Sequence, residues 1–227
     1  MLKNLINLLF PKLCMGCSAL LLNNEKIICT ECNHGLPYTN HHILENNDTT
    51  KKFYGIIPIE FSASMLYFHH NGIVQNLIHN LKYRKHQEIG SLLGKWYAKD
   101  LKSVSKIKTI TEIIPVPLHE KRLKERGYNQ ITTFCETLSE ELKIPYNPSL
   151  LYRNKYSKTQ TKKDKEHRKE VTNEIFDVNY NETNHNKHFL LVDDVMTSGA
   201  TLEACAKALL KIPNSKVSIV TIAYTLS

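Results

Sequence analysis

The sequence predicts an α/β fold, in which a mostly parallel sheet is flanked by helices and preceded by a small cysteine-bearing unit. Two observations support this prediction. From about residue 59 onward, short apolar or β-branched runs alternate with segments of helical periodicity, the order typical of α/β domains. Before about residue 38 the chain holds two CxxC pairs and few periodic apolar positions, so this part cannot form a core of its own.

Helical periodicity locates the helices of the larger unit. Apolar residues recur three or four positions apart around residues 73–81, 92–101, 131–142 and 202–210. Each segment is expected to form a helix with one buried face. Cys135 and Cys205 fall on two of these apolar faces, and we interpret them as core residues.

Apolar runs between these helices predict the strands. Residues 109–115 are rich in β-branched side chains and end at Pro115 and Pro117, which indicates a strand followed by a rigid loop. Residues 189–192 are continuously apolar, as expected for a strand buried on both faces. Residues 150–152 and 217–223 are further candidates, whereas residues 154–170 are mostly polar or basic and suggest a mobile loop or ribbon.

The pattern divides the chain into three parts. We expect an N-terminal helix and cysteine unit over residues 1–37, a polar connector over residues 38–58 and the α/β domain over residues 59–227. Residues 1–10 resemble a signal peptide, but their apolar stretch is shorter than the ~7–15 residues of its apolar region and no small-residue cleavage site follows, so we expect a short amphipathic helix instead. No apolar run approaches the roughly eighteen residues of a membrane span. We therefore expect a cytoplasmic protein.

Composition narrows the possible partners. With 41% hydrophobic and 23% charged residues, the 227-residue chain can bury a core, which excludes disorder as the default. The net charge of +8 favours nucleic acid, phosphorylated metabolites or anionic surfaces without choosing among them.

Four cysteines have the spacing of a zinc ribbon. Cys14 and Cys17 form one CxxC pair and Cys29 and Cys32 form the other, with eleven residues between the inner cysteines. Four thiolates would close the coordination of one Zn²⁺ ion, so its role should be structural. A redox or disulfide pair remains the alternative. The nearby His34, His41 and His42 are interpreted as surface residues.

The most informative segment is DDVMTSGAT, residues 193–201, which follows the apolar strand and opens a helix. Unpaired N–H groups at a helix start can wrap a phosphate, and a glycine lets the backbone approach it. Carboxylates placed before that turn can hold ribose hydroxyls and Mg²⁺. The candidate residues are Asp193, Asp194, Thr197, Ser198, Gly199, Ala200 and Thr201. The alternative is that these residues only cap the helix.

This segment resembles the signature that binds 5-phosphoribosyl-1-pyrophosphate (PRPP) in type I phosphoribosyltransferases. Two further blocks, LKYR at residues 81–84 and IPVPLH at residues 114–119 with RGYNQ at residues 126–130, are similar to the ComF family, whose members include bacterial competence factors. Together with the CxxC pairs, the resemblance covers roughly residues 5–225. It implies a type I phosphoribosyltransferase-like sheet behind an N-terminal zinc ribbon.

The resemblance also implies roles for residues outside the phosphate segment. Basic side chains near the diphosphate would be Lys82, Arg84, Arg122 and Arg126, and a closing loop would include Thr159, Gln160, Lys162 and Arg168. Positive charge suits a departing diphosphate. Each basic residue could instead be an ordinary solvated surface charge.

Two functions of different classes follow from the resemblance. The first is Mg²⁺-dependent binding of PRPP, with phosphoribosyl transfer to an acceptor, in a protein of DNA uptake and natural competence. The second is a module that binds single-stranded DNA beside the helicase machinery of uptake, in which the PRPP site is regulatory or vestigial. The sequence identifies no general base, and we assign no catalytic residue.

Overall fold

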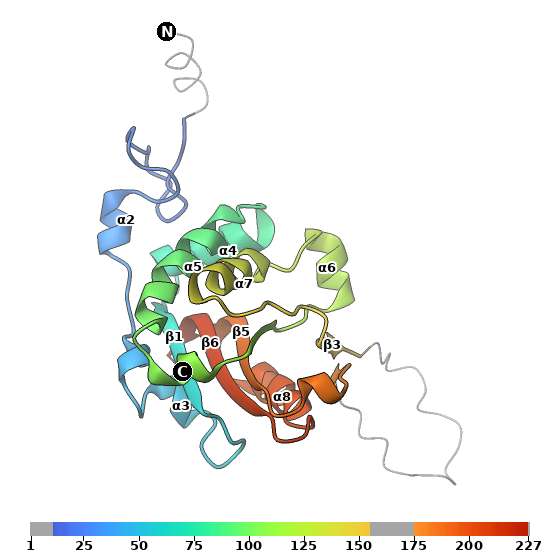
Figure 1. Ribbon diagram of the computed structural model, residues 1–227. Coiled ribbons are helices and arrows are strands. Elements are labelled where there is room, and N and C mark those ends of the chain that lie inside the picture. Colours follow the sequence, from blue (N-terminus) through green and yellow to red (C-terminus); the bar gives the residue numbers. More distant parts are fainter. Residues whose placement is uncertain (1–10, 155–174, 227) are drawn as a thin grey trace.

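The computed structural model describes residues 11–154 and 175–226 of the chain. Its centre is a four-stranded sheet with the order β1-β6-β5-β2, in which all neighbours are parallel. The strands are β1 (Phe61–Phe68), β2 (Glu112–Pro115), β5 (His188–Met196) and β6 (Lys216–Thr225). Because they run in one direction, their carboxyl ends meet at one edge of the sheet (Figure 1). Ligands of open parallel sheets bind at this edge.

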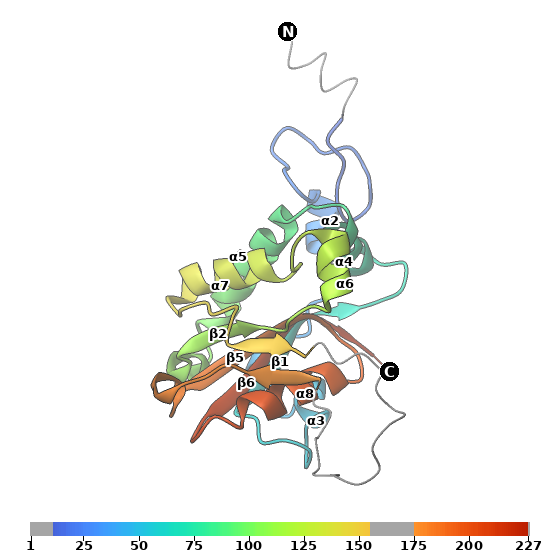
Figure 2. The ribbon, with the colours of Figure 1, turned by 90° about the vertical axis from the view of Figure 1, so that its right-hand side faces the viewer.

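Helices cover both faces of the sheet (Figure 2). One face carries α4 (Ile73–Tyr83), α5 (Glu88–Leu101) and α7 (Thr132–Leu142), and the other carries α3 (Asp48–Lys51) and α8 (Ala200–Leu209). Successive residues of β5 point to opposite faces. Leu190 and Val192 join the core beneath α4, α5 and α7, whereas Phe189 and Leu191 join the core beneath α8. Burial on both faces explains the continuous apolar run at residues 189–192.

Two glycines bring α5 and α7 into close contact. A Cβ atom on Gly90 would lie 2.3 Å from Thr133 Oγ1, and one on Gly94 would lie 3.0 Å from the carbonyl oxygen of Phe134. The glycines are four residues apart, so they present one bare face of α5 to the backbone of α7. This packing fixes the start of α7 near the carboxyl edge of the sheet.

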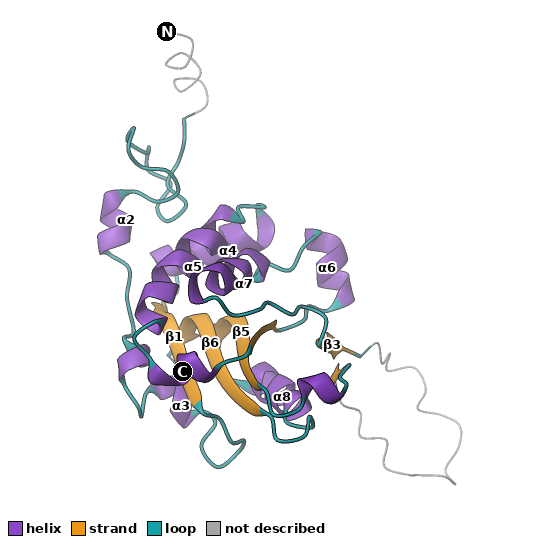
Figure 3. Cartoon of the chain, viewed as in Figure 1, coloured by secondary structure: helices purple, strands orange, loops and turns teal. Residues whose placement is uncertain are grey.

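Smaller elements surround this frame. Helix α2 (Thr30–His34) begins at the second cysteine pair, and α6 (Glu120–Arg126) follows β2. Strand β3 (Leu151–Arg153) pairs antiparallel with β4 (Phe176–Val178) in a separate ribbon. Figure 3 shows the strands of the main sheet enclosed between helices. Within the described residues, no helix combines the length and apolar character required to cross a membrane.

The structure confirms the predicted α/β fold with its mostly parallel sheet. The four predicted helices correspond to α4, α5, α7 and α8, and Cys135 and Cys205 are fully buried. The strand predicted at residues 109–115 is partly wrong, because Ser105–Thr109 form a 3-10 turn and β2 begins only at Glu112. In that turn, the Thr109 hydroxyl donates a 2.8 Å hydrogen bond to the Lys106 carbonyl. The predicted helix over residues 1–10 lies outside the described residues.

Part of the segment expected to be an irregular connector packs on the edge strand β1. The Asn47 amide donates hydrogen bonds to the carbonyls of Ser62 (2.7 Å) and His41 (3.0 Å). His41 is 1% exposed, and its ring stands edge-on to Tyr67 and Tyr224. The interpretation of His41 as a surface residue is therefore wrong. Its burial arises from strands far away in the sequence, which the local pattern of polar residues does not reveal.

Two buried histidines should make the protein less stable in mild acid. Burial lowers the pKa of His188, whose ring nitrogens contact Thr109 Oγ1 at 2.9 Å and Ser218 Oγ at 2.8 Å, and burial also lowers the pKa of His41. Each folded-state pKa then lies below the unfolded value of about 6.5. As the pH falls below about 7, the unfolded chain binds more protons, so the free energy of unfolding should decrease.

Urea unfolding at a series of pH values measures this dependence. The His188→Gln variant should lose stability less steeply between about pH 7 and pH 5, because one of the titrating groups is gone. His34→Gln changes an exposed histidine and should retain the wild-type slope. A wild-type slope in His188→Gln would show that His188 is not held neutral by burial.

Candidate functional site

A cavity of about 520 Å³ lies at the carboxyl edge of the sheet. Residues at or just beyond the ends of all four parallel strands line it, and α4, α6 and β3 contribute further side chains. Four cationic side chains face two carboxylates in this lining, which gives the cavity a positive surplus. The charged residues are Lys82, Arg122, Arg126, Arg153, Asp193 and Asp194. Such a surplus favours an anionic ligand.

Strand order gives the cavity two chemically different sides. On the β2 side lie residues 116–119 and the α6 side chains Arg122 and Arg126. On the β1 and β6 side lie Phe68, His70 and Thr225. The acid pair of β5 stands between them. The β2 side therefore carries two guanidinium groups and the imidazole of His119, and the other side carries the ring of Phe68 and the imidazole of His70.

The acid pair belongs to β5 itself. The sequence places Asp193 and Asp194 where the strand leaves the sheet, but β5 continues to Met196 because β6 extends alongside it, with Asp193 opposite Thr221. The chain then turns at Gly199, whose φ of +84° favours glycine, and α8 begins at Ala200. The first-turn N–H groups of α8 thus lie beyond the acids, as a phosphate site requires.

The two carboxylates have different surroundings. Asp194 is 5% exposed, and its backbone N–H donates to Asp193 Oδ1 at 2.8 Å. Burial, together with the neighbouring Asp194 carboxylate, raises the pKa of Asp193 above its ordinary value. Within the described residues, the other oxygen of Asp193 receives no hydrogen bond. Carboxylate oxygens are the donors that Mg²⁺ prefers, so the pair fits such an ion.

Asp194 is held by a chain of side-chain contacts. Lys82 Nζ lies 2.9 Å from Asp194 Oδ2, and Gln130 Nε2 donates to the same oxygen at 2.6 Å. Arg126 Nη1 in turn donates to Gln130 Oε1 at 2.6 Å, and the Arg126 guanidinium lies over the ring of Tyr83 at 4.9 Å. The network joins β5 to α4, α6 and the segment before α7.

The structure brings together most of the predicted site residues it describes. Asp193, Asp194, Thr197 and Thr201 line the cavity with Lys82, Arg122 and Arg126. Ser198, Gly199 and Ala200 form the turn and the start of α8 without lining the cavity. Arg84, just past the end of α4, is exposed and does not line it. Thr159, Gln160, Lys162 and Arg168 lie outside the described residues.

Sequence reasoning overlooked Gln130, although it belongs to the RGYNQ block at residues 126–130. Other members of that block hold neighbouring elements in place: the Tyr128 hydroxyl donates to the Leu81 carbonyl at 2.6 Å, and the Asn129 amide donates to the Val116 carbonyl at 3.0 Å. Within that block, only Arg126 was expected at the site. Polar side chains that flank them were the available signal.

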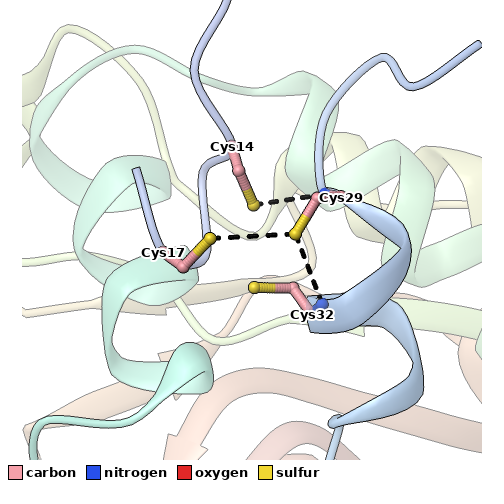
Figure 4. Close-up of side chains that lie close together, drawn as sticks. All are labelled: Cys14, Cys17, Cys29 and Cys32. Atoms are coloured by element: carbon pink, nitrogen blue, oxygen red, sulfur yellow. Dashed lines mark hydrogen bonds between the residues drawn. The ribbon is translucent and has the colours of Figure 1, made fainter. Parts of the chain in front are cut away.

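The four N-terminal cysteines form a second candidate site. The sulfur atoms of Cys14, Cys17, Cys29 and Cys32 all lie within 4.8 Å of one another (Figure 4). Two come from the loop before α2, and the others lie at the start of α2. Four thiol donors at one point are compatible with a structural zinc site.

Backbone N–H groups point at these sulfur atoms. Cys14 Sγ accepts hydrogen bonds from the backbone N–H groups of Gly16 (3.3 Å) and Cys29 (3.2 Å), and Cys29 Sγ accepts one from Cys32 N–H (3.4 Å). Burial raises the pKa of the Cys14 thiol, but hydrogen bonds from the backbone N–H groups of Cys29, Gly16 and Cys17 outweigh it and lower the pKa to about 7. The pKa of Cys32 shifts the other way, raised by burial and by the neighbouring thiols, so the geometry of the four sulfur atoms is what fits a cation.

The cysteine cluster is docked on α4. Asn76 Nδ2 donates to the Gly16 carbonyl at 2.7 Å, and Asn80 Nδ2 donates to the Met15 carbonyl at 2.9 Å. A Cβ atom on Gly16 would lie 2.9 Å from Cys32 Sγ, so the glycine allows the close approach. Ile78, His79 and Lys82 of the same helix line the large cavity. Helix α4 thus contacts both candidate sites.

Comparison with known proteins finds similarity to one family model and to several described proteins. The model for the phosphoribosyl transferase domain matches residues 132–227. DNA utilization protein YhgH of Shigella flexneri is 26% identical over 94% of this chain and 91% of its own length. Competence protein F of Haemophilus influenzae is 33% identical over 53% of each chain. Competence protein ComFC of Bacillus subtilis is 26% identical over 88% of this chain and 78% of its own.

Replacing two cluster cysteines tests whether the cluster holds zinc. In the Cys29→Ser, Cys32→Ser double variant, we expect zinc content by atomic absorption to fall from about one equivalent to near zero. Limited proteolysis should then cut residues 11–37 faster, because metal binding contributes to the folding of small units. Cys135→Ala removes a buried thiol outside the cluster and should keep the zinc. Unchanged zinc in the double variant would exclude this site.

Proposed function

We propose, on the premise that this chain belongs to the ComF family of phosphoribosyltransferase-like proteins, that its cavity binds PRPP together with Mg²⁺. The observation that best supports this proposal is the combination, in one cavity, of an acid pair, a helix start and a cationic wall. Each of these features suits a different part of the ligand.

The parts of PRPP match the lining in order. Thr197 and Thr201, which line the cavity at the turn before α8 and in its first turn, offer hydroxyl and N–H groups that suit the 5-phosphate. The carboxylates of Asp193 and Asp194 suit the ribose hydroxyls and Mg²⁺. Arg122 and Arg126, on the β2 side, suit the diphosphate, because charged hydrogen bonds to phosphate oxygens are among the stronger ones.

The same arrangement supports phosphoribosyl transfer. When the bond between C1 and the diphosphate oxygen breaks, the diphosphate leaves with the electron pair, and the cations on the β2 side stabilise its growing charge. An acceptor would then bond to C1 from the opposite side, which Phe68 and His70 line. When bound, Mg²⁺ would supply further positive charge for the diphosphate.

We assign a structural role to the cysteine cluster. A closed set of four thiolates, which we infer binds Zn²⁺, leaves no position for a reacting water. Reduced thiols at this site suit a cytoplasmic protein. We further propose that the chain consists of a zinc-bearing unit over residues 1–37, a connector over residues 38–58 and a phosphoribosyltransferase-like domain over residues 59–227.

Titration calorimetry with PRPP tests the main proposal. Binding should require Mg²⁺, and Asp193→Asn and Asp194→Asn should each weaken it by more than about tenfold, because each removes a charged partner of the ligand. Glu203→Gln neutralises an acid on α8 that does not line the cavity and should bind PRPP as the wild type does. Wild-type affinity in the double Asp193→Asn, Asp194→Asn variant, with its thermal unfolding unchanged, would overturn the assignment.

A second candidate function is binding of single-stranded DNA, in support of uptake with its helicase machinery. The names of the relatives suggest it, and so do exposed aromatic and basic residues around the cavity. Tyr83 is 63% exposed and Tyr152 is 41% exposed, so both could stack on bases. Exposed basic residues near Tyr83 or on α6, outside the cavity lining, are Arg84, Lys85, Lys121 and Lys124.

Charge removal separates this function from PRPP binding. Changing Arg84, Lys85, Lys121 and Lys124 to Ala should weaken binding of a fluorescent oligonucleotide by roughly tenfold or more and reduce its salt dependence. PRPP affinity should stay unchanged, because none of the four lines the cavity. The matched control changes four exposed lysines elsewhere, Lys26, Lys95, Lys99 and Lys108. If both quadruple variants lost the same affinity for the oligonucleotide, DNA would bind through the overall positive charge and not through this surface.

A further inference from the structure

Lys82 neutralises an acid of the pair in the structure described here. Its ammonium lies 2.9 Å from Asp194 Oδ2, and its side chain is 21% exposed where it lines the cavity. Among the described residues, Lys82 forms no other ion pair with a carboxylate. The contact is therefore partly open to solvent from the cavity, where a ligand would enter.

The contact places a positive charge beside two adjacent carboxylates, Asp193 and Asp194. Burial is the main reason that the pKa of Asp193 is raised, and repulsion from the neighbouring Asp194 carboxylate adds to it. The ammonium of Lys82 offsets that repulsion. Gln130 adds a neutral donor to the same oxygen of Asp194 but brings no charge. Lys82 is thus the cation that directly contacts the pair among the described residues.

A divalent cation bound to the acid pair would lie close to the Lys82 ammonium, and both are positively charged. At a separation of a few ångströms their repulsion is substantial in a partly buried site. Lysine has a flexible stem, so its ammonium can move away without moving the helix backbone. Arg126 is different, because its guanidinium is buried, bonded to Gln130 and stacked on Tyr83.

We propose that Lys82 is the resident counter-cation of the acid pair and that a divalent cation binds there by displacing the Lys82 ammonium from Asp194. Lys82 then acts as a positioning residue that sets how tightly the site holds a cation before the organic ligand arrives. The proposal rests on the proposed function only for the identity of the acid pair as the cation site.

The first test measures Mn²⁺ binding by calorimetry with no organic ligand present. Lys82→Met keeps the length of the side chain and removes its charge, so Mn²⁺ should bind roughly tenfold more tightly than in the wild type. Lys82→Arg keeps the charge and should remain within about twofold of the wild type. Adding Asp194→Asn to Lys82→Met should abolish the gain. Equal affinity of Lys82→Met and the wild type, or no binding by either, would overturn the proposal.

The second test uses the wild-type chain and so does not depend on how a variant folds. An amine-acylating reagent should modify Lys82 faster as Mn²⁺ is added, because the Lys82 side chain leaves its carboxylate partner and becomes more accessible in the cavity. Peptide mass spectrometry measures the rate against exposed Lys99 as the internal control. A Lys82 rate that stays constant relative to Lys99 would contradict displacement. Neither test contains PRPP, so failure to bind PRPP would overturn the proposed function and leave this result intact.

Discussion

The parallel pairing of β5 with β6 and β2 is the constraint on which the rest of the molecule depends. It holds Asp193 opposite Thr221 and Val192 opposite Pro115, and so brings three distant segments to one edge of the sheet. Side chains alternate along a strand, so a slip of one residue would exchange the faces of Asp193 and Asp194. Asp194 would then point away from Lys82. Each residue of the apolar run 189–192 would also face the opposite core. Core packing and site geometry therefore enforce the same register.

The elements around that edge are tied together by polar contacts as well as by apolar packing. The bare face of α5 at Gly90 and Gly94 fixes α7, and the segment just before α7 supplies Gln130 to the acid pair. Helix α4 carries the cysteine cluster through Asn76 and Asn80, and it places Lys82 in the cavity. The cysteine unit is consequently part of the support of the cavity wall.

Local chemistry determined what could be predicted from the sequence. The CxxC pairs and the acids, hydroxyls and glycine of residues 193–201 are short motifs. Each lies within a few consecutive residues, so both could be recognised from the sequence without knowledge of the fold. Helices such as α4 and α7 were recognised because their apolar periodicity spans several turns. These features gave the fold class, the cysteine cluster and the residues of the turn.

Contacts between distant segments could not be predicted in this way. Lys82 and Arg84 are two residues apart, yet only Lys82 lines the cavity, because the end of α4 decides which side chain faces it. The burial of His41 depends on Tyr67 and Tyr224, and the role of Gln130 depends on Asp194. The extension of β5 to Met196 likewise needs β6 beside it.

The docking of the cysteine cluster on α4 has a practical consequence for the study of this protein. A chelator added to remove Mg²⁺ also competes for any metal held by the four thiolates. Loss of that metal would release the loop that Asn76 and Asn80 hold, and the helix that carries Lys82 would lose its outer support. An apparent dependence on Mg²⁺ measured in chelator would then combine two changes. Dialysis into magnesium-free buffer, with thiol-bound metal quantified before and after, separates them.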